Sequence, residues 1–192
     1  MRGNRNASFA IKVGAIAATV LIVLCVAQAG PPSLQSRIDN FGCINPNLYR
    51  GAQPRASDYA DLAKMGVKTV IDLQRDGERD EQRLVESAGM KFYRIGLRDD
   101  AWPTSEQART FLKIVDDPGN QPVFIHCHGG RHRAGAMTAI YRITHDGWDA
   151  NRAYAEMKQY GFEKGIGHGT LKDYVYDYYS QRKQGEVVVT TR

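Results

Sequence analysis

The 192-residue chain has few cysteines, no internal repeat and no strong excess of charge of one sign. Its cysteines are Cys25, Cys43 and Cys127, and no pair of them has the C-x-x-C spacing of a zinc knuckle. So few thiols cannot form a disulfide framework, and the fold must therefore depend on a hydrophobic core. The 26 basic residues only slightly outnumber the 21 acidic ones, a balance too mild to indicate a nucleic-acid partner.

One apolar run is long enough to suggest an export signal or a membrane anchor. It spans residues 13–27, follows a basic and polar start, and ends in Ala27-Gln28-Ala29, a small-x-small pattern typical of signal peptidase sites. We expect residues 1–29 to be an export signal that is cut after Ala29, which would make the protein periplasmic if its source is bacterial. The alternative is an uncut anchor that attaches the chain to the membrane through residues 13–29. Either interpretation places the remaining chain across the membrane.

Beyond this segment, short apolar runs alternate with amphipathic ones, which is typical of an α/β domain. The hydrophobic share of 42% suits one globular core rather than two large domains. We expect a linker at residues 30–38, one folded domain at residues 39–183 and a mobile polar tail at residues 184–192.

Cap and turn residues divide the domain into elements. Ser57 is a predicted N-cap, and Thr104 with Gln107 three residues later forms a predicted capping box. Strands are expected as a hairpin at 41–49 and then at 67–73, 91–97 and 122–126, and helices at 57–66, 79–89, 104–116, 134–145, 149–160 and 170–183.

The strand expected at residues 122–126 leads into His126-Cys127-His128-Gly129-Gly130-Arg131-His132-Arg133 and then into a helix. This order places backbone N–H groups at a helix N-terminus, where they and the helix dipole favour an anion such as phosphate. A thiol at the base of such a loop loses its proton readily, and the thiolate is the attacking species. Five residues separate Cys127 from Arg133, enough for the loop to wrap a tetrahedral anion and return a two-pronged guanidinium to it.

Two other interpretations of Cys127 compete with this one. A cysteine after a buried strand is commonly inert core. A metal site is disfavoured because His126 and His128, on either side of Cys127, point to opposite faces of an extended chain and make a poor chelate. The strand, the His-Cys pair, the paired glycines, the arginine and the helix coincide, and this combination favours a catalytic cysteine.

The segment HCHGGRHR at residues 126–133 resembles the H-C-x-x-G-x-x-R signature of the protein tyrosine and dual-specificity phosphatase superfamily. The stretches NLYRGAQP (47–54), GVKTVIDL (66–73) and NQPVFIHC (120–127) are similar to atypical dual-specificity phosphatases of plants and fungi and their bacterial relatives. The resemblance implies an α/β fold in residues 39–183, with a mainly parallel four- or five-stranded sheet flanked by helices. It also implies a phosphocysteine intermediate and no metal or other cofactor.

The resemblance implies roles for individual residues as well. Cys127 is the expected nucleophile, and an aspartic acid on a separate loop protonates the leaving oxygen. Asp99 and Asp100 both follow the strand at 91–97, and we favour Asp99 because the family's acid directly follows that strand. The alternative is that both are solvated loop carboxylates. The expected phosphate-binding residues are His128, Gly129, Gly130, Arg131, His132 and Arg133.

One residue departs from the family pattern. Ala134 stands where Ser or Thr usually follows the loop arginine, and the missing hydroxyl would otherwise help the thiolate leave the phosphoenzyme. We expect a phosphomonoester hydrolase that acts on phosphorylated proteins or on small polyanionic phosphates, the latter suggested by Arg131 and His132. The alternatives are a phosphate-binding protein with little turnover and a sulfurtransferase of the rhodanese type.

Three further expectations concern residues near the loop or in the core. Asp72 and Arg75 are expected to serve the end of their strand, and the tyrosine-rich stretch 174–179 to pack in the core and on a helix surface. Cys43 and Cys127 are expected to lie too far apart to form a disulfide.

Overall fold

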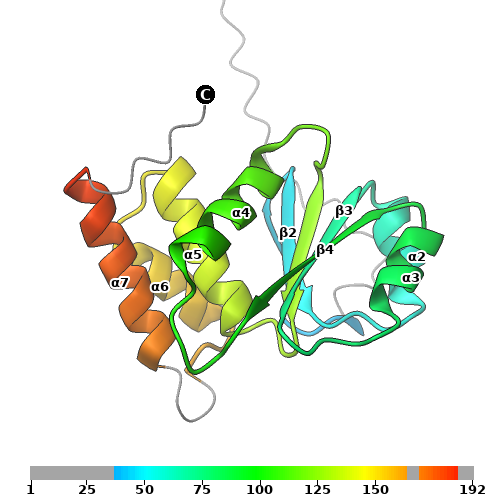
Figure 1. The fold of residues 1–192 in the computed structure, drawn as a ribbon, viewed down its shortest axis with the longest axis horizontal. Helices are drawn as coiled ribbons and strands as arrows, with labels where there is room; N and C mark the ends of the chain where they lie inside the picture. The colour runs from blue at the N-terminus through cyan, green and yellow to red at the C-terminus, as the bar shows by residue number, and fades with distance from the viewer. Residues whose placement is uncertain (1–36, 164–168, 186–192) are drawn as a thin grey trace, which may run out of the picture.

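The computed structural model describes residues 37–163 and 169–185 (Figure 1). The expected export signal at residues 1–29, nearly all of the linker and most of the tail therefore lie outside the described residues. Within the two described ranges, every helix is too short or too polar to span a bilayer.

Five strands form one sheet in the order β1-β2-β5-β3-β4. They are β1 (Gly42–Asn45), β2 (Leu48–Ala52), β3 (Thr69–Gln74), β4 (Lys91–Leu97) and β5 (Val123–Cys127). Only the β1–β2 pair is antiparallel, and β2, β5, β3 and β4 run parallel. The expected mainly parallel α/β sheet is thereby confirmed, and the loops that follow β3, β4 and β5 meet at one edge of it.

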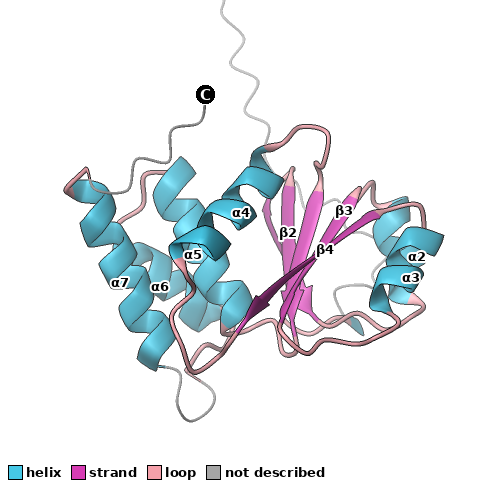
Figure 2. Ribbon diagram, in the orientation of Figure 1, coloured by secondary structure: helices cyan, strands magenta, loops and turns pink. Residues whose placement is uncertain are grey.

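Helices cover both faces of the sheet (Figure 2). One face packs against α2 (Asp58–Lys64) and α3 (Glu81–Ser87). The other packs against α4 (Ser105–Asp116), α5 (Arg133–His145), α6 (Ala150–Gln159) and α7 (Gly169–Lys183). Because β3 and β5 are covered on both faces, every residue of these strands is buried, which explains their nearly uninterrupted apolar runs.

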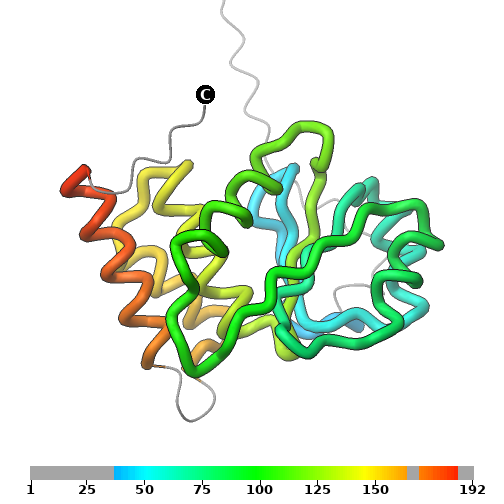
Figure 3. Tube along the Cα trace, in the orientation of Figure 1, coloured from blue at the N-terminus to red at the C-terminus, as the bar shows by residue number. Residues whose placement is uncertain are grey.

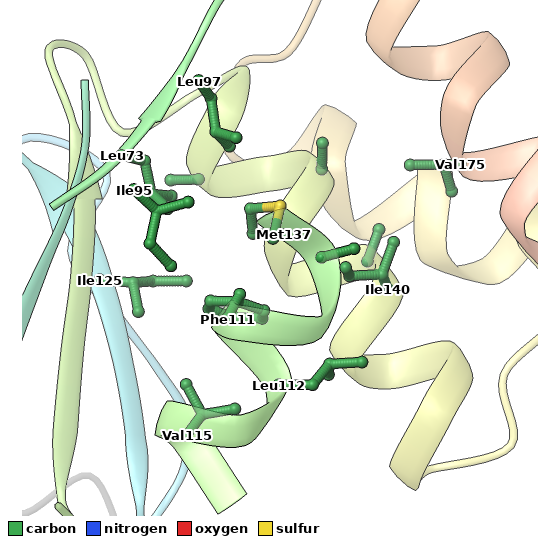
Figure 4. Close-up of a cluster of buried hydrophobic side chains, with 14 of the residues drawn as sticks. Leu73, Ile95, Leu97, Phe111, Leu112, Val115, Ile125, Met137, Ile140 and Val175 are labelled. Carbon is green, nitrogen blue, oxygen red and sulfur yellow. The ribbon is translucent and has the colours of Figure 1, made fainter. Parts of the chain in front are cut away.

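The larger core lies between the sheet and α4, α5 and α7 (Figure 4). Ile125 of β5 faces Phe111 and Met137, and Val175 of α7 closes the far side. Burying one such side chain stabilises the fold by about 1.5–3 kcal/mol. Tyr174 and Tyr178 are buried in the same core, as expected for the tyrosine-rich stretch.

The two predicted helix caps have different outcomes. The capping box is confirmed, because Gln107 N donates to Thr104 Oγ1 at 3.1 Å and Thr104 N donates to Gln107 Oε1 at 2.8 Å. Ser57 does stand at the N-cap position of α2, as predicted, but it has helical backbone angles and its side chain makes no capping bond. The neighbouring Asp58 instead accepts a bond from the Arg55 N–H at 2.9 Å, so a tight turn stabilised by Asp58 precedes the helix.

Candidate active site

Cys127 is the last residue of β5 and Arg133 is the first residue of α5, so the loop between them joins a central strand to a helix N-terminus (Figure 3). Cys127 is 3% exposed and carries a free thiol, so it is not bonded to Cys43. The structure therefore places the candidate nucleophile at the carboxyl edge of the sheet, where parallel α/β folds hold their ligands.

Three consecutive carbonyls of this loop each accept a hydrogen bond from an earlier part of the chain. The bonds are Gln53 N to His128 O at 3.2 Å, Asn40 Nδ2 to Gly129 O at 2.7 Å, and Arg50 Nη2 to Gly130 O at 2.5 Å. In a trans peptide the N–H points away from the carbonyl of the same plane. The N–H groups of Gly129, Gly130 and Arg131 are therefore turned to the opposite side of the loop.

These N–H groups are available to a ligand. Within the described parts of the chain, no backbone N–H from His128 to Arg131 donates to a carbonyl or to a side chain. Unpaired N–H groups at the N-terminus of α5 favour an anion at this position. The loop thus has the geometry of the predicted phosphate nest.

Gly130 fits the loop closely against β2. Its φ of +64° lies in the left-handed region, and a Cβ here would lie 2.4 Å from the Gly51 carbonyl carbon. Both the backbone angle and the close approach require glycine at this position. Gly129, the other glycine of the pair, has no positive φ, and a Cβ there would have no close contact.

A polar pocket of about 230 Å³ brings the predicted acid and the predicted phosphate ligand together. Its lining residues are Arg75, Asp76, Leu97, Arg98, Asp99, Asp100 and Arg133. They come from the ends of β3 and β4 and from the start of α5, which share one edge of the sheet. Arg75, which directly follows the end of β3, also lines this pocket.

Asp99 and Asp100 differ in their partners. Asp100 accepts two hydrogen bonds from Arg98, at 2.8 and 2.7 Å, and this pairing lowers the pKa of Asp100. Asp99 makes no hydrogen bond or ion pair within the described residues. A carboxyl that is held ionised by an arginine is a poor proton donor, so the geometry favours Asp99 as the acid.

His126 lies in a buried charged cluster on the α3 side of the sheet. Its Nε2 is 2.8 Å from Glu81 Oε1, and both side chains are fully buried. Glu81 also accepts bonds from Tyr59 Oη at 2.7 Å and from Gln53 Nε2 at 3.0 Å. Burial raises the pKa of Glu81, but the hydrogen bond and charge of His126, together with the other two donors, outweigh it and bring the value to about 2.

Asp72 completes this cluster and has more than the expected role at the strand end. It accepts the Gln74 N–H at 2.8 Å and also forms an ion pair with Arg94 at 2.8 Å. Burial raises the pKa of Asp72, whereas His126, the Gln74 N–H and Arg94 act in the opposite direction.

The ligand atoms of Asp72, Glu81 and His126 lie within 4.8 Å of one another, a set of groups that suits a metal ion. Arg94, however, already neutralises the cluster, because it lies 3.6 Å from Glu81 Oε2 as well as pairing with Asp72. We therefore interpret the cluster as an internal charge network that orients His126.

The remaining predicted loop residues differ in exposure. His128 is exposed, and Arg131 is half-buried. His132 Nε2 is 2.9 Å from the Phe162 carbonyl oxygen, and neither Arg131 nor His132 lines the pocket that contains Asp99. Ala134 is fully buried in the first turn of α5.

Several residues of the site escape sequence reasoning. The missed residues are Asn40, Arg50, Gln53, Tyr59, Glu81 and Arg94. Arg50 and Gln53 lie in the NLYRGAQP stretch, where an arginine inside an otherwise apolar strand was the available signal. The other four carry no local pattern, because each reaches its partner from a distant part of the chain.

A family model described as PTP-NADK, a DSP-PTPase phosphatase fused to NAD+ kinase, matches residues 42–170. The chain is 32% identical over 136 residues to the dual specificity protein phosphatase TpbA of Pseudomonas aeruginosa, covering 71% of this chain and 59% of that protein. It is 26% identical over 132 residues to the inositol diphosphatase SIW14 of Saccharomyces cerevisiae, covering 66% and 47%. The chain therefore spans about half the length of the curated relatives it matches.

Solved structures give the same assignment. The crystal structure of P. aeruginosa TpbA has a TM-score of 0.66 at 26% identity and covers 79% of this chain and 93% of that one. TpbA in complex with phosphotyrosine has a TM-score of 0.64 at 27% identity, with 76% and 89% covered. The SIW14 catalytic core, at 22% identity and a TM-score of 0.66, covers 79% and 96% and shares the fold. The loop, the sheet and these matches together show that the chain belongs to the DSP-PTPase family.

Proposed function

We propose that this chain is a metal-independent phosphomonoester hydrolase in which Cys127 is the nucleophile. The observation that carries the proposal is the loop geometry, in which three anchored carbonyls turn the N–H groups of residues 129–131 to the side available to a ligand. These N–H groups and the Arg133 guanidinium are the donors that a phosphate dianion requires.

The reaction proceeds in two displacements. The Cys127 thiolate attacks phosphorus and forms an S–P bond, while the O–P bond to the leaving group breaks and Asp99 gives its proton to the departing oxygen. Asp99, now ionised, takes a proton from water as the water oxygen attacks the phosphocysteine. The S–P bond breaks, and inorganic phosphate and the thiolate are released.

The pocket charge favours substrates with one phosphoryl group. Three arginines and three carboxyl groups line it, and with Asp99 protonated its walls carry only about one net positive charge. The relative TpbA has been solved with phosphotyrosine, whereas SIW14 is named an inositol diphosphatase. We propose phosphotyrosine-type substrates first, with inositol phosphates as the competing class.

Hydrolysis of p-nitrophenyl phosphate in EDTA tests the mechanism. The wild type should be active, and Cys127→Ser should bind tungstate without hydrolysing substrate, because the hydroxyl is a far weaker nucleophile than a thiolate. Cys43→Ser is the matched control and should keep its activity. Full activity in Cys127→Ser, or loss of activity on chelation, would refute the mechanism. Parallel assays with a phosphotyrosine peptide and an inositol pyrophosphate decide between the substrate classes.

A second candidate is a phosphate-binding protein with little turnover. It is favoured by Ala134, which provides no hydroxyl in the buried first turn of α5. Tungstate binding by a wild type that hydrolyses no phosphate ester would support it. Persulfide formation on Cys127 from thiosulfate would instead identify the sulfurtransferase alternative.

The placement of the protein outside the cytoplasm is also part of the proposal. Its support is the sequence pattern of residues 1–29 alone, and cleavage after Ala29 in an expressing bacterium would test it.

A further inference from the structure

Arg50 is a fully buried arginine in β2. It lies behind the loop of residues 128–132 between β5 and α5, here called the phosphate loop. Its Nη2 donates to the Gly130 carbonyl at 2.5 Å. Its Nε and Nη1 find no hydrogen-bond partner within the described residues. No carboxylate in those residues forms an ion pair with it either. Arg50 is therefore a cation held inside the protein without a matching anion.

The groups that surround this guanidinium fix its position. The centre of the Tyr160 ring lies 4.0 Å from the guanidinium carbon of Arg50. A Cβ placed at Gly135 would lie 3.8 Å from Arg50 Nη2, so α5 also packs against the guanidinium. Tyr160 is itself held close to β1, because a Cβ at Gly42 would lie 2.1 Å from its hydroxyl oxygen. Strands β1 and β2, helix α5 and the residue after α6 thus enclose Arg50 on the α5 side of the sheet.

Burial lowers the pKa of Arg50 to about 10, while Tyr160, Cys127 and Glu156 act in the opposite direction. At neutral pH the guanidinium still carries its proton, because this value lies well above 7. A buried charge without a counter-ion is costly, and buried charges in proteins are usually paired with an opposite charge. Here the anions that arrive are the Cys127 thiolate and the bound phosphate.

We propose that Arg50 is a positioning residue of this site, one that fixes Gly130 and places a permanent positive charge behind Cys127. It acts from the buried side of the loop and is not placed to touch substrate, whereas Arg133 lines the pocket and is the arginine that the proposed function assigns to the phosphate. The role in turnover rests on the proposed phosphatase function, but the effect on the thiolate does not.

The titratable groups around Arg50 and Cys127 come from four elements. Arg50 lies on β2 and Arg133 on α5. His126, paired with Glu81, precedes Cys127 on β5. Tyr160 and Glu156 belong to α6 and its C-terminal end. Two basic groups of this set are fully buried, Arg50 and His126. His126 pairs with Glu81, whereas Arg50 has no anionic partner among the described residues.

The test compares Arg50→Met and Arg50→Lys with Arg182→Met. Arg182 also donates one Nη2 to a backbone carbonyl, that of Thr144, but far along the chain from the loop. Three quantities are measured: the melting temperature, the pH midpoint of Cys127 alkylation by iodoacetamide, followed by mass spectrometry of its peptide, and kcat/KM for p-nitrophenyl phosphate.

Arg50→Met should raise the alkylation midpoint by about one pH unit or more, because a nearby opposite charge favours the ionised thiol. Its kcat/KM at pH 7 should fall, because Gly130 loses its anchor and the attacking thiolate loses a nearby positive charge. Its melting temperature should be unchanged or higher, since an uncompensated buried charge is gone. The alkylation midpoint of Arg50→Lys should lie between those of Arg50→Met and the wild type, because lysine keeps the positive charge. Arg182→Met should change neither the midpoint nor kcat/KM.

An unchanged alkylation midpoint in folded Arg50→Met, or in folded Arg50→Lys if the Met variant fails to fold, overturns the proposal. A lower melting temperature with an unchanged midpoint would mean that Arg50 is only structural. Alkylation needs no substrate, so a wild type that hydrolyses nothing would end the phosphatase proposal while the midpoint still decides the role of Arg50.

Discussion

Asp99 and Asp100 are neighbours on one loop, and the arginine beside them makes them chemically different. Arg98 binds Asp100 through two nitrogens and lowers its pKa. Asp99 lines the pocket with Arg133 and has no such partner among the described residues. A general acid must carry a proton when the substrate binds, so the unpaired carboxyl is the better donor.

Replacing Asp99 by Asn should slow alkyl phosphates by about 10²–10⁴-fold, the usual contribution of a positioned acid. Hydrolysis of p-nitrophenyl phosphate should slow far less, because its leaving group scarcely needs a proton. Asp100→Asn is the matched control and should keep both rates within a few-fold of wild type. Steady-state kcat on the two substrates checks the assignment, which is wrong by one residue if Asp100→Asn shows the selective loss.

Strand β5 serves the site on both of its faces, because successive side chains point to opposite sides of a sheet. His126 faces the Glu81 cluster and stacks on Phe124 at 5.8 Å. Cys127 follows it at the strand end, on the side of the larger core. The buried Glu81–His126 pair therefore fixes the residue that immediately precedes the nucleophile.

The Glu81 carboxylate should stabilise the fold in a pH-dependent way. Its pKa is about 2 in the folded protein against 4.5 ordinarily, so the stabilisation is complete above about pH 4.5 and is lost as pH falls toward 2. The groups that face it are His126, Tyr59, Gln53, Asp72 and Arg94. Glu81→Gln should lower the free energy of unfolding at pH 7 by about 3 kcal/mol, the usual loss when one partner of a buried pair is removed.

Urea unfolding of the wild type and Glu81→Gln at several pH values measures this effect. The gap between them should narrow between about pH 4.5 and pH 2. Gln82→Ala, an exposed change at the next residue of α3, is the control and should give a small, pH-independent difference. A gap that stays constant down to pH 2 would contradict the assigned ionisation of Glu81.

The elements that carry local signals were predictable, and the contacts between distant segments were not. The capping box at Thr104 and the apolar run of β5 can each be recognised from a few neighbouring residues. The bond from Arg50 to Gly130 joins residues 80 positions apart, and no pattern near either residue reports it. Glu81 looks like an ordinary first-turn helix acid until the fold places it against His126.

On the scale of the whole molecule, the phosphate loop is supported from nearly every layer. Asn40 before β1, Arg50 in β2 and Gln53 after β2 each donate to a carbonyl of the loop. The N-terminus of α5 points its dipole at the loop, and Tyr160, the residue after α6, packs on Arg50. An anion in the loop would accept hydrogen bonds from the N–H groups of residues 129–131 and would offset the charge of Arg50 without touching it. Ligand binding should therefore be visible in the stability of the entire domain.

Tungstate, a tetrahedral phosphate analogue, should raise the melting temperature of the wild type. A ligand at 100 times its Kd stabilises by about 2.7 kcal/mol, which corresponds to roughly 5–10 °C for a domain of this size. Cys127→Ser should keep most of the shift, because the N–H groups and Arg133 remain. Arg133→Lys should lose most of it, since an ammonium cannot form the two-pronged bond. Scanning fluorimetry with sodium chloride at matched ionic strength separates binding from salt screening. An equal shift in Arg133→Lys and wild type would show that the anion binds elsewhere and would remove Arg133 from the site.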